Sequence, residues 1–67
     1  MNIKRKKDHN DNFFYIKNKQ VIIDPIILEG IKKLVIPPAW KHVRISSNPL
    51  DKVLCTGYDS KDRKQYK

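Results

Sequence analysis

The sequence predicts a small α+β domain in which one helix packs on an antiparallel β-sheet of about four or five strands. The chain has 67 residues, which allows a single domain with a thin hydrophobic core. Short stretches rich in β-branched and aromatic residues are bounded by turn residues, as strands are, and one stretch repeats apolar residues at helical spacing. Hydrophobic residues make up 39% of the chain and are clustered along it, so we expect a folded domain.

Residues 1–12 are predicted to form a mobile basic arm, and residues 13–67 the folded domain. The arm contains the run Lys4-Arg5-Lys6-Lys7 and no apolar residue except Met1 and Ile3. A terminal charge run of this kind fits a solvated tail without a partner at least as well as an arm that binds one.

A β-hairpin is predicted next. Phe13–Ile16 and Gln20–Ile23 are its strands, because aromatic and β-branched side chains suit a pleated, half-buried surface. Asn18-Lys19 supplies the turn, although it lacks the favoured Asn-Gly pair, so the sequence does not assign a turn type.

A helix is predicted to begin at Asp24-Pro25. The Asp24 carboxylate can accept from exposed backbone N–H groups, and Pro25 fits the first helical position. Pro37-Pro38 ends the helix, because proline cannot continue the hydrogen-bond ladder. One face turns toward a core through apolar residues at intervals of three and four: Ile27, Leu28, Ile31, Leu34 and Val35.

Three further strand-like stretches complete the predicted sheet. They are Ala39–Ser46, Lys52–Tyr58 and Arg63–Lys67, and the first alternates apolar with polar residues. The turns between them are expected at Ser47–Asp51 and Asp59–Asp62. Within these strands we expect a core anchor at the single tryptophan, a small buried apolar residue at the single cysteine, and an exposed histidine: Trp40, Cys55 and His42.

The net charge of +8, from 15 Lys and Arg against 7 Asp and Glu, favours a polyanionic partner. Nucleic acid comes first and an acidic membrane surface second, while a soluble domain that is merely basic remains the alternative. No apolar run approaches the roughly 18 residues that span a bilayer, and no apolar segment follows the basic start as in a secretory signal. We therefore expect no membrane partner, while an intracellular location, wherever DNA is held, is inferred only from a nucleic-acid partner.

One cysteine excludes an internal disulfide and a cysteine-rich zinc site. His9 and His42 are far apart and have no cysteine pair near them, so we expect no metal site and no cofactor.

Three ordered blocks in the second half of the chain carry a family resemblance. They are Ile36-Pro37-Pro38-Ala39-Trp40, then Val43-x-Ile45-Ser46, then Thr56-Gly57-Tyr58-Asp59-x-Lys61-x-Arg63-Lys64-Gln65-Tyr66. In order and spacing they resemble the N-terminal domain of type IB DNA topoisomerases, with the bacterial, poxvirus and large-DNA-virus branch the closer comparison. The family has Gly where this chain has Asp62. We expect a positive φ there, which Asp tolerates, and a negative charge beside the proposed phosphate contacts.

The resemblance implies that residues 13–67 clamp one side of duplex DNA. It places Gln65 and Tyr66 at the target site and Lys61 and Arg63 near the DNA backbone. Cations bind phosphates, Gln can pair with an adenine edge, and a two-stranded ribbon fits the major groove. The full set of predicted nucleic-acid contacts is Lys61, Arg63, Lys64, Gln65, Tyr66 and Lys67. The alternative is a solvated strand edge on which Lys discourages edge-to-edge pairing.

The resemblance also implies an activity, an ATP- and metal-independent isomerase that relaxes supercoils through a transient tyrosyl-phosphate. The family places the nucleophile in a helical C-terminal domain, to which nothing in this chain corresponds. Tyr15, Tyr58 and Tyr66 lie on predicted strands without an Arg–Arg–His surround, so we expect no catalytic residue here and no activity from the chain alone.

We therefore expect a monomeric N-terminal fragment that works with a missing catalytic domain. Two alternatives stay open: a free-standing basic DNA-binding module, and an interaction or ribosome-associated module whose charge meets RNA or protein.

Overall fold

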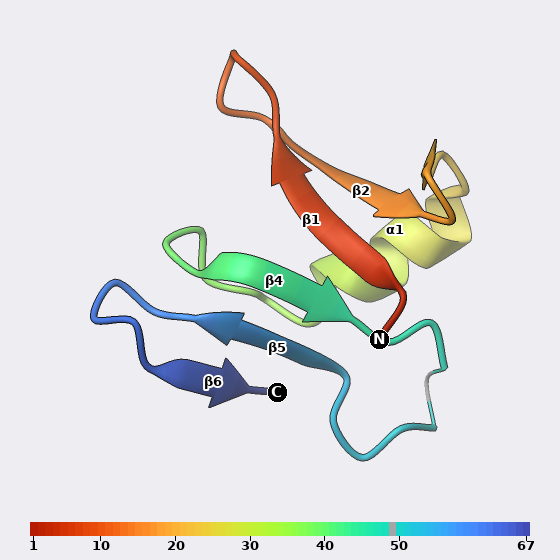
Figure 1. Cartoon of the computed structure of the whole chain (residues 1–67). Coiled ribbons are helices and arrows are strands. Elements are labelled where there is room, and N and C mark those ends of the chain that lie inside the picture. Colours follow the sequence, from red (N-terminus) through yellow and green to blue (C-terminus); the bar gives the residue numbers. More distant parts are fainter. Residues whose placement is uncertain (49) are drawn as a thin grey trace.

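A computed structural model describes residues 1–48 and 50–67 of the chain. Its elements are β1 (Ile3–Lys7), β2 (Phe13–Lys17), β3 (Gln20–Val21), α1 (Pro25–Lys32), β4 (Lys41–Ile45), β5 (Cys55–Tyr58) and β6 (Lys64–Tyr66). The strands form one sheet in the order β3-β2-β1-β4-β5-β6, and all neighbouring strands are antiparallel (Figure 1). The α+β prediction with one packed helix is confirmed, with six strands rather than four or five.

The prediction of a mobile arm over residues 1–12 is wrong for residues 3–7, which form the central strand β1. This strand pairs with β2 along its length and with β4 at Ile3 and Lys4. The charge run hid it, because a strand needs only every second side chain to be covered. Ile3 is 2% exposed in the core, and Arg5 is half-buried on the same face.

The predicted hairpin forms from β2 and β3. Asn18 and Lys19 at its turn have φ of 52° and 65°. Positive φ at both central residues is the type I′ geometry, whose twist matches that of the flanking strands. The second strand is shorter than predicted, since β3 ends at Val21 and is followed by one more bond to β2, from the Ile22 N–H to the Tyr15 carbonyl at 2.8 Å.

Asp24 caps α1 as predicted, since its side chain accepts from the backbone N–H of Ile26 at 2.9 Å. The helix ends at Lys32, before the proline pair, and the chain turns through Val35 at a φ of 51°. Of the predicted apolar stripe, Ile31 is buried and Leu34 packs partly buried against the core. Within the described residues, no helix is long and apolar enough to cross a membrane.

The core lies between α1 and the sheet and consists of Ile3, Ile31, Val43, Ile45 and Cys55. Trp40 packs partly buried against this cluster, and Cys55 is fully buried, as predicted. Burial also raises the pKa of the Cys55 thiol, as is typical of a cysteine in a hydrophobic core.

A β-bulge interrupts β4. Lys41 pairs with Tyr58 and Arg44 with Thr56, so one extra residue of β4 lies opposite β5. His42, exposed as predicted, adopts a φ of 53° at this bulge. The turn predicted over Ser47–Asp51 contains Pro49, which lies outside the described residues.

Candidate nucleic-acid interface

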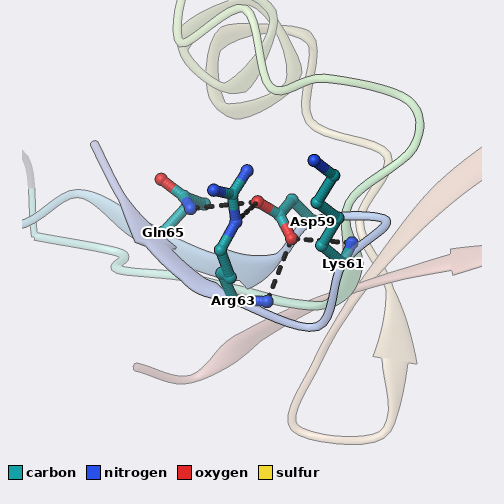
Figure 2. Close-up of polar contacts among 4 residues, drawn as sticks. All are labelled: Asp59, Lys61, Arg63 and Gln65. Carbon is teal, nitrogen blue, oxygen red and sulfur yellow. Dashed lines mark hydrogen bonds and ion pairs between the residues drawn. The ribbon is translucent and has the colours of Figure 1, made fainter.

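The loop between β5 and β6 carries the first of the predicted contact residues and is organised by Asp59. The Oδ1 atom of Asp59 accepts from the backbone N–H groups of Lys61 and Arg63, each at 2.9 Å (Figure 2). The Asp59 N–H donates to the carbonyl of Arg63 at 3.0 Å, which closes the loop. Asp62 has a φ of 59°, so the predicted left-handed residue is confirmed.

The second carboxylate oxygen of Asp59 binds two of the side chains that were predicted to contact DNA. Its Oδ2 accepts from Arg63 Nε at 2.9 Å and from Gln65 Nε2 at 3.2 Å, as Figure 2 shows. The backbone N–H of Arg63, followed by that of Lys61 and the Arg63 side chain, lowers the pKa of Asp59. Asp59 is therefore a carboxylate that orders the loop and orients both side chains.

Asp62 does not place an isolated negative charge beside these cations. Its Oδ1 lies 2.7 Å from Lys41 Nζ, in an exposed ion pair that joins the loop to the start of β4. Exposed pairs contribute little stability, so the main effect of this pair is to balance the charge of Asp62 locally.

The strand register distributes the six predicted contact residues over two faces of the sheet. Gln65 is opposite Gly57, while Lys64 and Tyr66 are opposite Tyr58 and Thr56. Directly opposed residues of an antiparallel pair project from the same face.

Gly57 lies under Trp40, because a Cβ built on it would stand 2.7 Å from Trp40 Cε3. Gln65 therefore belongs to the face covered by α1 and the Ile36–Trp40 segment. Lys64 and Tyr66 belong to the other face, where the Lys64 Nζ lies 5.8 Å from the centre of the Tyr66 ring.

Lys61 is exposed in the loop, apart from both groups. Lys67 is directly opposite the core residue Cys55, to which its backbone donates at 2.9 Å and from which it accepts at 3.1 Å, so Lys67 belongs to the covered face with Gln65. The structure thus unites Arg63 with Gln65, and Lys64 with Tyr66, but it does not bring all six side chains to one face.

The uncovered face of the sheet, which we call the open face, carries further cations that the sequence analysis did not assign to a site. Lys4 is opposite both Ile16 and Arg44, and Lys6 is opposite Phe14. Residues 3–7 are one isoleucine followed by four cations, so no alternation of apolar with polar residues pointed to this face in the sequence. The open face consists of Lys4, Lys6, Phe14, Ile16, Val21, Lys41, Arg44, Thr56, Tyr58, Lys64 and Tyr66.

Arg5, between Lys4 and Lys6, lies on the covered face and has a structural role. Its guanidinium donates to the carbonyls of Pro37 at 3.0 Å and Trp40 at 2.9 Å, and more weakly to Ile36 at 3.5 Å. Its Cζ lies 4.1 Å from the centre of the Phe13 ring. Burial lowers the pKa of Arg5, but the guanidinium stays protonated at neutral pH. Arg5 thereby fixes the Ile36–Trp40 segment over the sheet.

No group of three or more His, Cys, Asp or Glu side chains that could hold a metal ion occurs in residues 1–48 and 50–67.

Comparison with known proteins assigns the family. Residues 12–59 match the model of the bacterial DNA topoisomerase IB N-terminal domain, a span that contains the first two sequence blocks and the start of the third. The DNA topoisomerase 1B of Acanthamoeba polyphaga mimivirus is 40% identical over 55 residues. That alignment covers 82% of this chain and 16% of the viral protein, and no solved structure matches. The chain belongs to the family of bacterial DNA topoisomerase IB N-terminal domains.

Proposed function

We propose that this chain is the part of a type IB DNA topoisomerase that grips duplex DNA through phosphate and major-groove contacts. Membership of the N-terminal domain family carries this proposal. The chain spans 16% of the length of the curated relative it matches. In the proposal, supercoils are relaxed by the whole enzyme, and the tyrosine nucleophile belongs to a catalytic domain outside this sequence.

The β5–β6 ribbon is the proposed contact element. β6 is an edge strand of the sheet, so no neighbouring strand covers its outer edge. A two-stranded ribbon has dimensions that fit the major groove. Lys61 and Lys64 supply exposed ammonium groups, and Arg63 keeps its two Nη groups for a phosphate while Nε is bonded to Asp59.

Gln65 and Tyr66 would do different work in this arrangement. Tyr66 is 61% exposed on the open face, so its hydroxyl can reach a phosphate or base edge without rearrangement. Gln65 is half-buried and donates to Asp59 Oδ2. It contacts a base only after that bond opens or while the amide oxygen alone points outward, so base recognition by Gln65 is coupled to the Asp59 loop.

The test is the salt dependence of binding to a duplex oligonucleotide. Three phosphate contacts from the ribbon give a slope of log K against log salt of about −3. Changing Lys61→Ala, Arg63→Ala and Lys64→Ala together should make the slope less steep by about that amount. Gln65→Ala should instead alter preference among DNA sequences with little change in slope.

A matched control removes three cations elsewhere: Lys19→Asn, Lys32→Gln and Lys33→Gln, at the β2–β3 turn and the end of α1. This variant has the same net charge as the ribbon variant and should keep most of the slope. Absence of duplex binding, a preference for structured RNA, or equal slopes for the ribbon and control variants would contradict the proposal.

A further inference from the structure

We propose that Lys4, Lys6 and Arg44 on the open face form a second phosphate-binding surface, so that duplex DNA runs across the sheet from β6 to β1 instead of touching the edge ribbon alone. This inference rests on the proposed function, because it takes duplex DNA as the partner.

The register aligns Lys4 and Arg44 with the ribbon, and Lys6 lies two residues beyond Lys4 on the same face of β1. Lys4 is opposite Arg44, Arg44 is opposite Thr56, and Thr56 is opposite Tyr66, so one continuous row crosses β1, β4, β5 and β6. Three strand spacings are about 14 Å. This is about the axial rise of four nucleotides of one DNA strand, so a row of this length can follow successive phosphates.

The open face is selectively cationic. It carries Lys4, Lys6, Lys41, Arg44 and Lys64 and no acidic residue, because the six strands contain no Asp or Glu and every described Asp and Glu lies in a loop or in α1. The chain has 7 Asp and Glu residues against 15 Lys and Arg, so a random distribution would place some carboxylates on the sheet, but none lies there. A surface composed in this way is complementary to a polyanion.

Lys4 and Arg44 are directly opposed like charges, an arrangement that destabilises an antiparallel pair. In the described part of the chain the ion pairs are Lys41–Asp62 and Arg63–Asp59, and neither includes Lys4, Lys6 or Arg44. All three side chains are exposed. A phosphate between them would relieve the repulsion, whereas Arg5 on the covered face already has its carbonyl partners.

Aromatic side chains share the open face with these cations. Phe14 is opposite Lys6, and Tyr58 and Tyr66 lie on β5 and β6, with Tyr58 in edge contact with His42 at 6.2 Å between ring centres. Tyrosine hydroxyls are common donors to DNA phosphates, and they favour a nucleic-acid backbone over an acidic protein segment as the occupant.

The decisive experiment compares four proteins by salt-dependent binding to one duplex oligonucleotide: the unmodified chain, the ribbon variant, the control variant and an open-face variant. The open-face variant carries Lys4→Gln, Lys6→Gln and Arg44→Gln, which match the control in net charge. If the open face binds phosphates, the unmodified chain has a slope near −5 to −6 instead of −3, and the open-face variant loses about 2 to 3 of it.

A second measurement does not depend on how the variants fold. Acetylation of lysines in the unmodified chain, with and without DNA, should show Lys4 and Lys6 protected several-fold while Lys32 and Lys33 react equally in both samples. A conservative variant, Lys4→Arg with Lys6→Arg, should retain the slope of the unmodified chain.

The outcomes separate the two proposals. If the chain does not bind duplex DNA, both fail. If the chain binds and the ribbon variant loses slope, but the open-face variant matches the control and Lys4 and Lys6 stay reactive, only the open-face inference is overturned.

Discussion

The two faces of the sheet use their cations in opposite ways, and β1 shows this within consecutive residues. Arg5 projects to the covered face, where two backbone carbonyls lie within 3.0 Å of its guanidinium and the Phe13 ring lies against it. Lys4 and Lys6 project to the open face, where they are exposed. The same run of cations therefore contains Arg5, which stabilises the fold, and Lys4 and Lys6, which are free to bind a ligand. Net charge alone cannot make this distinction.

The largest expected effect lies on the covered face, at Gly57→Ala. An added Cβ would stand 2.7 Å from Trp40 Cε3 and 3.2 Å from Val43 Cγ2, so the tryptophan must shift. Overpacking of this kind costs about 1–3 kcal/mol, and each kcal/mol lowers Tm by about 4–8 °C in a domain of this size. Thermal unfolding followed by circular dichroism measures the change.

Gly30→Ala is the matched control for that substitution. It adds the same methyl group inside α1, where nothing lies within 4 Å of the new Cβ. Alanine is preferred to glycine in a helix by about 1 kcal/mol, so this variant should be more stable than the unmodified chain. If both alanine variants shifted Tm in the same direction, the close packing of Trp40 on Gly57 would not limit stability.

The second effect concerns Arg5→Lys. The variant keeps the charge, but an ammonium group cannot reproduce the planar fork that reaches the Pro37 and Trp40 carbonyls and stacks on Phe13. We expect a loss of about 1–2 kcal/mol in the free energy of unfolding.

Lys6→Gln on the open face is the comparison, and it should change stability by less than about 0.5 kcal/mol. Urea titration measures both variants. The distinction between the faces would break down if Lys6→Gln were as destabilising as Arg5→Lys.

Local sequence patterns predicted the elements whose signals are local. Asp24-Pro25 specified the start of α1, and the character of residues 13–23 specified a hairpin, because caps and turns depend on neighbouring residues. The positive φ of Asp62 followed from the glycine that the family has at that position. β1 was missed because its stability comes from pairing with β2 and β4, and β4 is more than 30 residues away in the sequence.

The sequence predicted the candidate site as one continuous segment of residues, whereas successive side chains of a strand point to opposite faces of the sheet. Residues 61–67 are neighbours in sequence, but the register sends Gln65 and Lys64 to different faces. The open-face cations come from β1 and β4, and only the strand order brings them beside the ribbon. Long-range pairing was the missing information, so residue types alone could not define the surface.

The β1–β2 loop and the β5–β6 loop have the same backbone conformation and the same pattern of hydrogen bonds to an aspartate. In the loop between β1 and β2, Asp8 Oδ1 accepts from the N–H groups of Asn10 at 2.8 Å and Asn12 at 2.9 Å, and Asp11 has a φ of 62°. Asp59 and Asp62 occupy the same places in the β5–β6 loop. The difference is the second carboxylate oxygen, which in Asp59 also binds the Arg63 and Gln65 side chains.

The smallest expected effect tests this difference with Asp59→Asn against Asp8→Asn. Asparagine keeps one oxygen for the backbone N–H groups, so Asp8→Asn should leave stability at neutral pH nearly unchanged. At Asp59 the new amide group faces two donors, so it loses the bond from Arg63 Nε, and Gln65 must turn its own amide over to present an oxygen in place of Nε2. We therefore expect Asp59→Asn to be the less stable of the two and to show altered DNA sequence preference, because Gln65 is reoriented.

The pH dependence of stability is an independent test of the role of Asp59. The Arg63 backbone N–H, with the other donors of the loop, lowers the folded-state pKa of Asp59 below its ordinary value of 3.8. A depressed folded-state pKa stabilises the fold above the unfolded-state pKa, and this contribution is lost as pH falls through the folded-state value. Below about pH 4 the unmodified chain should therefore lose stability faster than Asp59→Asn. Parallel acid-unfolding curves for the two proteins would mean that the Asp59 carboxylate does not hold the ribbon loop in place.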